Sequence, residues 1–267
     1  MNNLIFAFGV TLFAGLCTGI GSLLAFFTKK TNTKFLSISL GFSAGVMIYV
    51  SMVEIFFEAK NLIVGELGAI RGSWVTVIGF FFGIFFIALI DTFIPECESS
   101  HEIYKFKDIK SNNKKIDGNL LRLGLFTALA IVIHNFPEGI VTFLTAMQEP
   151  NIAIPIVIAI AIHNIPEGIA VSVPIYYATG SRRKAFRYSI LSGLSEPIGG
   201  VVGYLILRPF INNLIFGMIF AAVAGIMVFI SLDELLPSAQ KYGEHYLSIY
   251  GLVAGMIVMA ISLLLFI

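Results

Sequence analysis

Long runs of apolar residues, separated by polar connections, make up most of this chain. The runs are continuous rather than alternating, and each can cross about 30 Å of hydrocarbon at about 1.5 Å per helical residue. Backbone polar groups in lipid must be paired within their own segment, which favours helices over a barrel. We therefore predict an all-α, polytopic membrane protein with eight transmembrane helices, at Leu4–Phe27, Phe35–Phe57, Trp74–Ile94, Leu120–Leu144, Ile152–Tyr177, Phe186–Leu207, Asn213–Leu236 and Tyr246–Ile267.

One sizeable polar segment interrupts this pattern. Residues Pro95–Asn119 are rich in charge, Ser, Asn and Lys and have no apolar period, so we predict a mobile loop there. The start of the chain lacks the positive charge of a signal peptide, so the first apolar run should remain as a membrane helix. No separate soluble domain is visible, and residues 1–267 are expected to form a single transmembrane domain.

The basic residues are concentrated in the connections on one side of the predicted membrane. Of the 17 Lys and Arg residues, all but Lys60, Arg71 and Arg208 lie on the side of the odd-numbered connections. The positive-inside rule then places these connections, and the loop at 95–119, in the cytoplasm, with both termini outside it. The chain is thus expected to be a multi-pass protein of the cell membrane.

Composition narrows the chemistry further. The chain is 57% apolar and 12% charged, with a mean hydropathy of +0.91, which fits a bilayer and not a soluble domain. Its net charge of +1 is not gathered into a basic face, so no nucleic-acid partner is expected. The two cysteines, Cys17 and Cys97, exclude a disulfide framework or a Cys-rich zinc module. A metal site must therefore use histidines and carboxylates.

Two internal repeats occur. Residues 134–140 (HNFPEGI) match residues 163–169 (HNIPEGI), with one conservative difference. A second match relates Ala44-Gly45-Val46-Met47, Ser51 and Glu54 to Ala224-Gly225-Ile226-Met227, Ser231 and Glu234. The predicted topology makes both repeats inverted, and such repeats often surround the site of a transporter. Packing by small residues would also explain the second match.

The HNxPEG motifs carry the candidate chemistry. Positions three and four apart share a helix face, so His134 and Glu138 can bind one ion while Asn135 and Glu138 reach a second. A carboxylate has two oxygens and can bridge two metals, which predicts a binuclear cage. Imidazole with carboxylate suits zinc or iron(II), whereas amide and carboxylate oxygens suit harder or more weakly held ions. The same spacing recurs in His163, Asn164 and Glu167.

Prolines and a third glutamate support a midplane site. Pro137 and Pro166 remove a helical hydrogen bond and should kink their helices. The motif histidines and Glu196 lie near the middle of their spans, where a charge costs on the order of 3 kcal/mol or more. No Lys or Arg is predicted at that depth. A single acid there could be protonated and bonded to a neighbour, but a repeated set of polar groups on three helices favours a bound cation.

Other polar or sulfur-containing residues are weaker candidates. Met47 in the second span is more often a packing residue than a ligand. Glu54 should lie near the outer end of its span, and Asp233 and Glu234 near the cytoplasmic end of theirs. Each is either a ligand at the mouth of a pathway or an interfacial charge. The histidines His101 and His245 are too isolated to join a site.

Taken together, these features resemble the ZIP (Zrt/Irt-like) metal transporters, specifically their bacterial ZupT type. The resemblance covers the eight spans, both HNxPEG motifs, the Ser195-Glu196-Pro197 segment and the related second and seventh spans. It implies a transporter, not an enzyme, that takes Zn²⁺ and Fe²⁺ into the cytoplasm, with manganese, cobalt and cadmium as further candidates. The metal is cargo, and no catalytic cofactor is implied.

The resemblance also implies the division of ligands. A first site would use His134, Glu138, His163 and Glu167, and Met47 matches a methionine that touches this metal in some relatives. A second site would use Asn135, Glu138, Asn164, Glu167 and Glu196. Many family members carry a histidine-rich third connection, whereas this one holds only His101, so a metal-sensing role for it is in doubt.

Two other functions compete with metal transport. An intramembrane metal-dependent hydrolase is the main alternative, but the H-E-x-x-H pattern is absent and no separate general base is evident. A proton- or sodium-coupled carrier of an organic solute lacks a recognisable pocket. The sequence leaves open the preferred metal, the coupling ion, carrier versus channel transport, and whether the protein forms a homodimer.

Overall fold

Helices make up nearly all of the computed structural model, which describes residues 2–27, 33–93, 118–207, 212–242 and 245–264. The first part holds α1 (Asn2–Phe27), α2 (Thr33–Val50), the π-helical segment η1 (Ser51–Ile55), α3 (Phe56–Leu67) and α4 (Ala69–Phe93). Then follow α5 (Gly118–Gln148), α6 (Pro150–Thr179), α7 (Arg182–Gly193), α8 (Ser195–Leu207), α9 (Asn213–Ile230), the π-helical η4 (Ser231–Leu235), α10 (Leu236–Tyr242) and α11 (His245–Leu264). Among these described residues, eight helical spans are long and apolar enough to cross a membrane, which confirms the predicted fold class.

Some helix boundaries differ from the predicted spans. The second span continues through η1 and α3 to Leu67, well past the predicted end at Phe57, because polar residues there leave the hydrocarbon without ending the helix. Gly68 ends it with a φ of 78°, a backbone conformation that favours glycine, and α4 begins at once instead of at Trp74. Of the predicted loop at 95–119, residues 95–117 lie outside the described residues and 118–119 begin α5.

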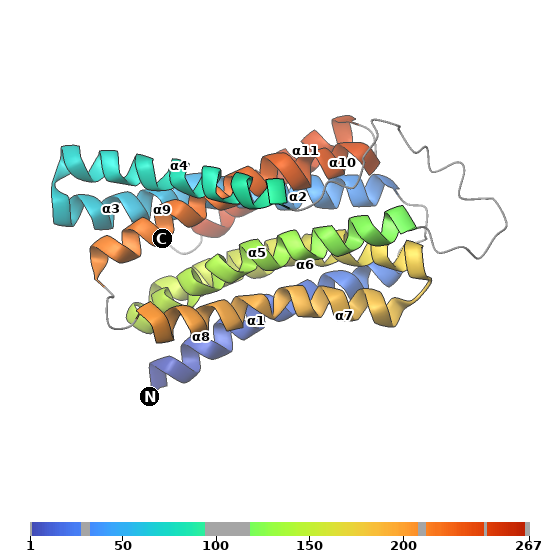
Figure 1. Cartoon of the computed structure of the whole chain (residues 1–267), viewed down its shortest axis with the longest axis horizontal. Coiled ribbons are helices and arrows are strands. Elements are labelled where there is room, and N and C mark those ends of the chain that lie inside the picture. The colour runs from blue at the N-terminus through green and yellow to red at the C-terminus, as the bar shows by residue number, and fades with distance from the viewer. Residues whose placement is uncertain (1, 28–32, 94–117, 208–211, 243–244, 265–267) are drawn as a thin grey trace.

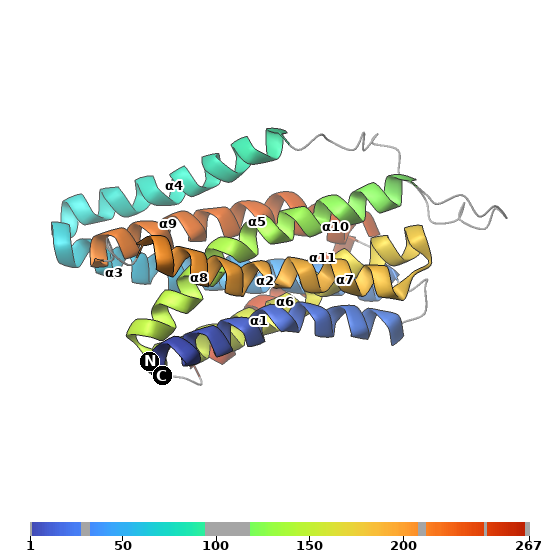
Figure 2. The same cartoon turned by 60° about the horizontal axis from the view of Figure 1, so that its bottom comes forward.

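The helices fall into two groups. In the first group, α1, α5, α6, α7 and α8 pack on one another, and in the second, α2 packs on α11 while α4 and α3 pack on α9. Figure 1 shows the first group on one side of the molecule and the second on the other. Contact between the groups is made by α2 and α11 with α6 and by α5 with α9. In Figure 2, α1 starts and α11 ends at the same end of the molecule, as an even number of spans requires.

Glycines bring helices together inside each group. Gly45 of α2 lies against the carbonyl of Leu252 in α11, and Gly168 of α6 lies against the carbonyl of Thr18 in α1. Similar close approaches join α4 to α9 and α5 to α8. All the close glycine contacts found among the described residues lie within one group. The backbone-to-backbone packing that holds membrane helices tightly is therefore a property of each group.

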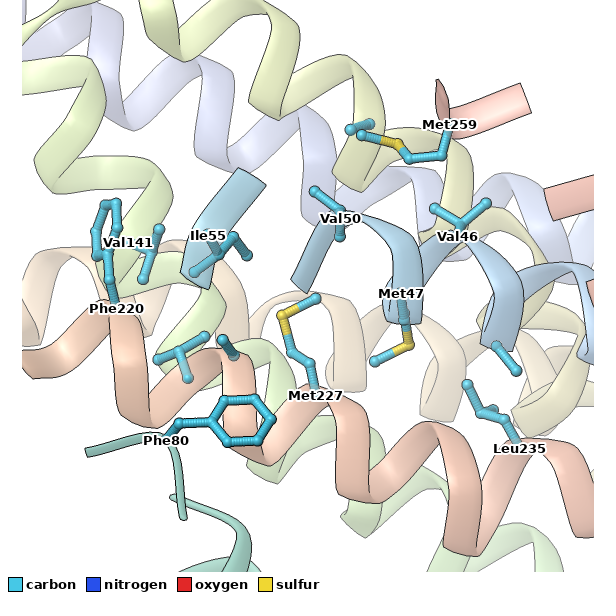
Figure 3. Close-up of a cluster of buried hydrophobic side chains, with 14 of the residues drawn as sticks. Val46, Met47, Val50, Ile55, Phe80, Val141, Phe220, Met227, Leu235 and Met259 are labelled. Atoms are coloured by element: carbon cyan, nitrogen blue, oxygen red, sulfur yellow. The ribbon is translucent and has the colours of Figure 1, made fainter. Parts of the chain in front are cut away.

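Larger apolar side chains fill the boundary between the groups. Met47 and Val50 of α2 and Met227 of α9 are buried in one cluster with Val141 of α5 and Ile169 of α6. Figure 3 shows Met47 extending from α2 toward α9 and Met227 extending from α9 toward α2. This boundary thus depends on side-chain packing.

A glycine substitution tests the close packing. In Gly45→Ala, the added Cβ would meet the Leu252 carbonyl, a backbone group that cannot turn aside. We expect a loss of about 1–3 kcal/mol of stability, measured as a lower thermal midpoint in detergent. Gly9→Ala is the control, because a Cβ there meets nothing within 4 Å and both positions gain the same helix propensity. Equal midpoints for the two variants would contradict the packing described.

Candidate metal site

The two HNxPEG motifs lie inside long helices. Pro137 is within α5, which remains helical through it and changes direction along its length in Figure 2. The second motif lies in α6, and both motifs are well inside their helices. Of His134 and His163 only the backbone is described, so their predicted role as ligands stays a prediction.

The asparagine and glutamate side chains of the two motifs are buried, and so is Glu196. Each has an exposed fraction of 0%, and they come from α5, α6 and α8. The carboxylates of Glu138 and Glu167 lie close enough to that of Glu196 to interact with it electrostatically. Gly139, next to Glu138, lies against the Glu196 carbonyl, so the close approach of α5 and α8 is made at the site itself. The fully buried group consists of Asn135, Glu138, Asn164, Glu167 and Glu196.

Asn164 orients one side of this group. Its amide nitrogen donates to the Ala14 carbonyl at 3.0 Å and to Glu196 Oε2 at 2.8 Å. With both N–H groups used, the amide oxygen must point elsewhere. This geometry fixes the Glu196 carboxylate and leaves the Asn164 oxygen for another partner.

Several polar atoms of the site have no hydrogen-bond partner among the described residues. They are both amide atoms of Asn135, Oδ1 of Asn164 and Oε1 of Glu196. A buried polar atom left without a partner costs about 1–3 kcal/mol, so such atoms call for an explanation. A dication held between them would satisfy the oxygens and reduce the repulsion among the carboxylates. The donor set, oxygens with the motif imidazoles nearby in sequence, suits a divalent transition metal.

Sequence reasoning missed the part played by α1. The Ala14 carbonyl holds Asn164, and Gly21 approaches the Ile165 carbonyl beside the second motif. The signal available was the run of small residues in the first span, which permits a close approach but does not say to which helix.

Asp91 is a second residue near the site that the sequence did not predict. At the end of α4 this residue meets Asp233 and Glu234 of η4, with one oxygen of each within 4.8 Å of the others. The three line a pocket together with Ile133, the residue before the first motif histidine. Asp233 and Glu234 thus line a pocket with Asp91, whereas Glu54 lies in η1 of the other repeat unit. Whether these acids are ligands or interfacial charges stays a prediction.

The second repeat has a structural counterpart. The π-helical segments η1 and η4 begin at Ser51 and Ser231, the residues that the sequence match relates to each other. Met47 and Met227 each lie one turn earlier and are both fully buried in the apolar cluster (Figure 3). A ligand role for Met47 stays a prediction, since its described surroundings are apolar.

Comparison with known proteins gives one consistent result. The family model described as "ZIP Zinc transporter" matches residues 95–263. The "Zinc transporter ZupT" of Clostridium perfringens is 61% identical over 100% of this chain and 98% of its own length. Those of Lysinibacillus sphaericus and Oceanobacillus iheyensis are each 62% identical, over 98% and 99% of this chain and the same shares of their own lengths.

The role of Asn164 can be tested without metal. In Asn164→Ala the buried Glu196 carboxylate loses its hydrogen-bond donor, and we expect a loss of about 1–3 kcal/mol, read as a lower thermal midpoint of the metal-free protein. The matched control is Asn213→Ala, which removes an exposed 3.2 Å hydrogen bond to Glu66 and should change stability by less than about 0.5 kcal/mol. Indistinguishable midpoints would mean that Asn164 does not support Glu196.

Proposed function

This chain belongs to the ZIP zinc transporter family, which makes it a membrane transporter and not an enzyme, and we propose that it carries Zn²⁺ into the cytoplasm. The proposed route runs through the buried group formed by Asn135, Glu138, Asn164, Glu167 and Glu196, together with the motif histidines. The curated relatives are named as zinc transporters, which makes zinc the first candidate substrate. Iron(II) is the second, with manganese, cobalt and cadmium as weaker candidates, because imidazole and carboxylate ligands also suit these ions.

One observation carries this proposal. Three glutamates and two asparagines are fully buried together at the middle of the spanning helices, and oxygens of Asn164 and Glu196 are without a hydrogen-bond partner in the described chain. Intramembrane acids of this kind are costly unless a cation, a proton or a basic group neutralises them. A transported dication would neutralise these acids, and the family description names zinc as such an ion.

For transport we propose alternating access between the two helix groups. The described ligands all lie on α5, α6 and α8, within one group, and this group is held internally by glycine contacts and by hydrogen bonds such as that from Ser189 Oγ to the Thr18 carbonyl (2.9 Å). The boundary with the other group consists largely of apolar side chains. Apolar packing has no fixed direction, so one group can slide on the other, and the site would then travel with its own group.

The pocket beside Ile133 supports a release route. It lies at the ends of α4 and α9 that the positive-inside rule places in the cytoplasm, with both termini on the opposite side. Asp91, Asp233 and Glu234 give this opening a negative potential, which would draw a cation from the site toward the cytoplasm.

Uptake into proteoliposomes tests the proposed site. Glu138→Gln and Glu167→Gln each keep the shape of the side chain and remove its charge. We expect saturable zinc uptake to fall more than about 100-fold, since even outer-shell partners of a metal change affinity about 10- to 100-fold. Glu66→Gln, an exposed acid in α3, should transport as the native protein does. Saturable uptake by the double variant Glu138→Gln/Glu167→Gln would place the site elsewhere, and uptake that never saturates would indicate a channel.

Cross-linking tests the movement of the groups. With Cys17 and Cys97 replaced, the pair Ile133→Cys and Ile230→Cys joins α5 to α9 across the boundary, and the pair Ile87→Cys and Ile230→Cys joins α4 to α9 within one group. All three positions line the same pocket. Bridging the first pair with a short thiol-reactive linker should stop nearly all zinc uptake until the linker is cleaved.

The second pair is the matched control. Bridging it should leave most of the uptake intact, because α4 and α9 move together. Full activity with both pairs bridged would mean that transport does not require the groups to move.

A further inference from the structure

A short, hydrogen-bonded turn fixes the direction in which α7 begins. Gly180 ends α6 with a φ of 65°, and Ser181 caps α7 by accepting a hydrogen bond from the Lys184 amide at 3.3 Å. The Thr179 hydroxyl accepts from the Ser181 amide at 3.2 Å and donates to the Ile175 carbonyl at 2.7 Å. Side chains in the first turns of α7 therefore project from a well-defined helix end.

These first turns are strongly basic. Arg182, Arg183, Lys184 and Arg187 are all exposed, and α7 contains no acidic residue. Arg182 lies over the Tyr176 ring, 5.8 Å from its centroid, and so is part of the turn. The other three place their charges at the surface.

The basic side of α7 continues into a lipid-facing stripe. From Arg187 to Leu205 is about 27 Å at about 1.5 Å per residue, close to the hydrocarbon thickness of about 30 Å. Arg187 and Lys184 therefore lie at the level of the headgroups, and Tyr188 lies at the interface where tyrosines gather. Their direction is toward lipid, because exposed residues at helical spacing follow one another along the stripe: Lys184, Arg187, Tyr188, Leu191, Ile198 and Leu205.

We propose that Arg183, Lys184 and Arg187 form a binding site for the phosphate groups of anionic phospholipids. A guanidinium can hold two phosphate oxygens at once, and an ammonium adds a point charge. A zwitterionic headgroup offers the same phosphate beside a positive amine, so it competes poorly. Under the proposed orientation the lipids belong to the cytoplasmic leaflet. Since α7 packs on α1 and α6, bound lipid would hold the helix group that carries the metal site.

Native mass spectrometry of the purified, metal-free full chain tests this site. The protein is released from nanodiscs that contain equal amounts of phosphatidylglycerol and phosphatidylcholine, and the retained lipids are counted. We expect preferential retention of phosphatidylglycerol, and a loss of that preference of about fivefold for each charge removed in Lys184→Gln/Arg187→Gln. The measurement needs no zinc, so its result tests the lipid site independently of the proposed transport.

Two further variants complete the test. Lys60→Gln/Arg71→Gln removes the same charge from α3 and α4 at the opposite end and should keep the native preference. Lys184→Arg/Arg187→Lys keeps the charge and should also keep the native lipid preference. This variant separates the effect of lost charge from the effect of a disturbed helix. Equal retention of both lipids by the native protein, or an equal loss in both Gln variants, would overturn the proposal.

Discussion

Mutual repulsion among buried carboxylates is the constraint on which the rest of the structure depends. Glu138, Glu167 and Glu196 are fully buried and interact electrostatically within one group of polar side chains. Ionised acids are stable in such surroundings only with a counter-charge or a set of hydrogen bonds. The hydrogen bond from Asn164 stabilises one of them, Glu196. At the proposed metal site a dication and protons would be alternatives in this respect, so binding of metal would be linked to release of protons.

Close backbone packing is what makes such a group possible. Gly139 and Gly168 stand directly after the two motif glutamates, and each lies against a carbonyl of a neighbouring helix. The same residues that bring the proposed ligands together therefore hold α1, α5, α6 and α8 in one unit. The proposed carrier mechanism requires both a rigid site and an apolar boundary, since the geometry of the ligands would have to persist while their helix group moves.

The spans and the site helices were predictable because they depend on local features. Run length marks a span, and spacing of three and four residues places Asn135 and Glu138 on one face of α5. Hydropathy marks the edge of the hydrocarbon but not the end of a helix, so the continuation of the second span to Leu67 was not predicted. Asp91 meets Asp233 only because α4 packs on α9, and Ala14 acts through a backbone carbonyl, which leaves no mark in its side chain.

The π-helical segments connect the inverted repeat to the direction in which the site opens. A π segment leaves the helical hydrogen-bond ladder with unmatched groups. In η4 the Ser231 hydroxyl donates to the Met227 carbonyl at 2.7 Å, whereas the Ser51 hydroxyl in η1 has no hydrogen-bond partner among the described residues. The pocket opens beside η4. In transporters with inverted repeats, the opposite conformation arises when the two repeats exchange their arrangements. Movement of the groups as proposed would then give Ser51 and Glu54 the surroundings that Ser231 and Glu234 have here, with the opening on the other side of the membrane.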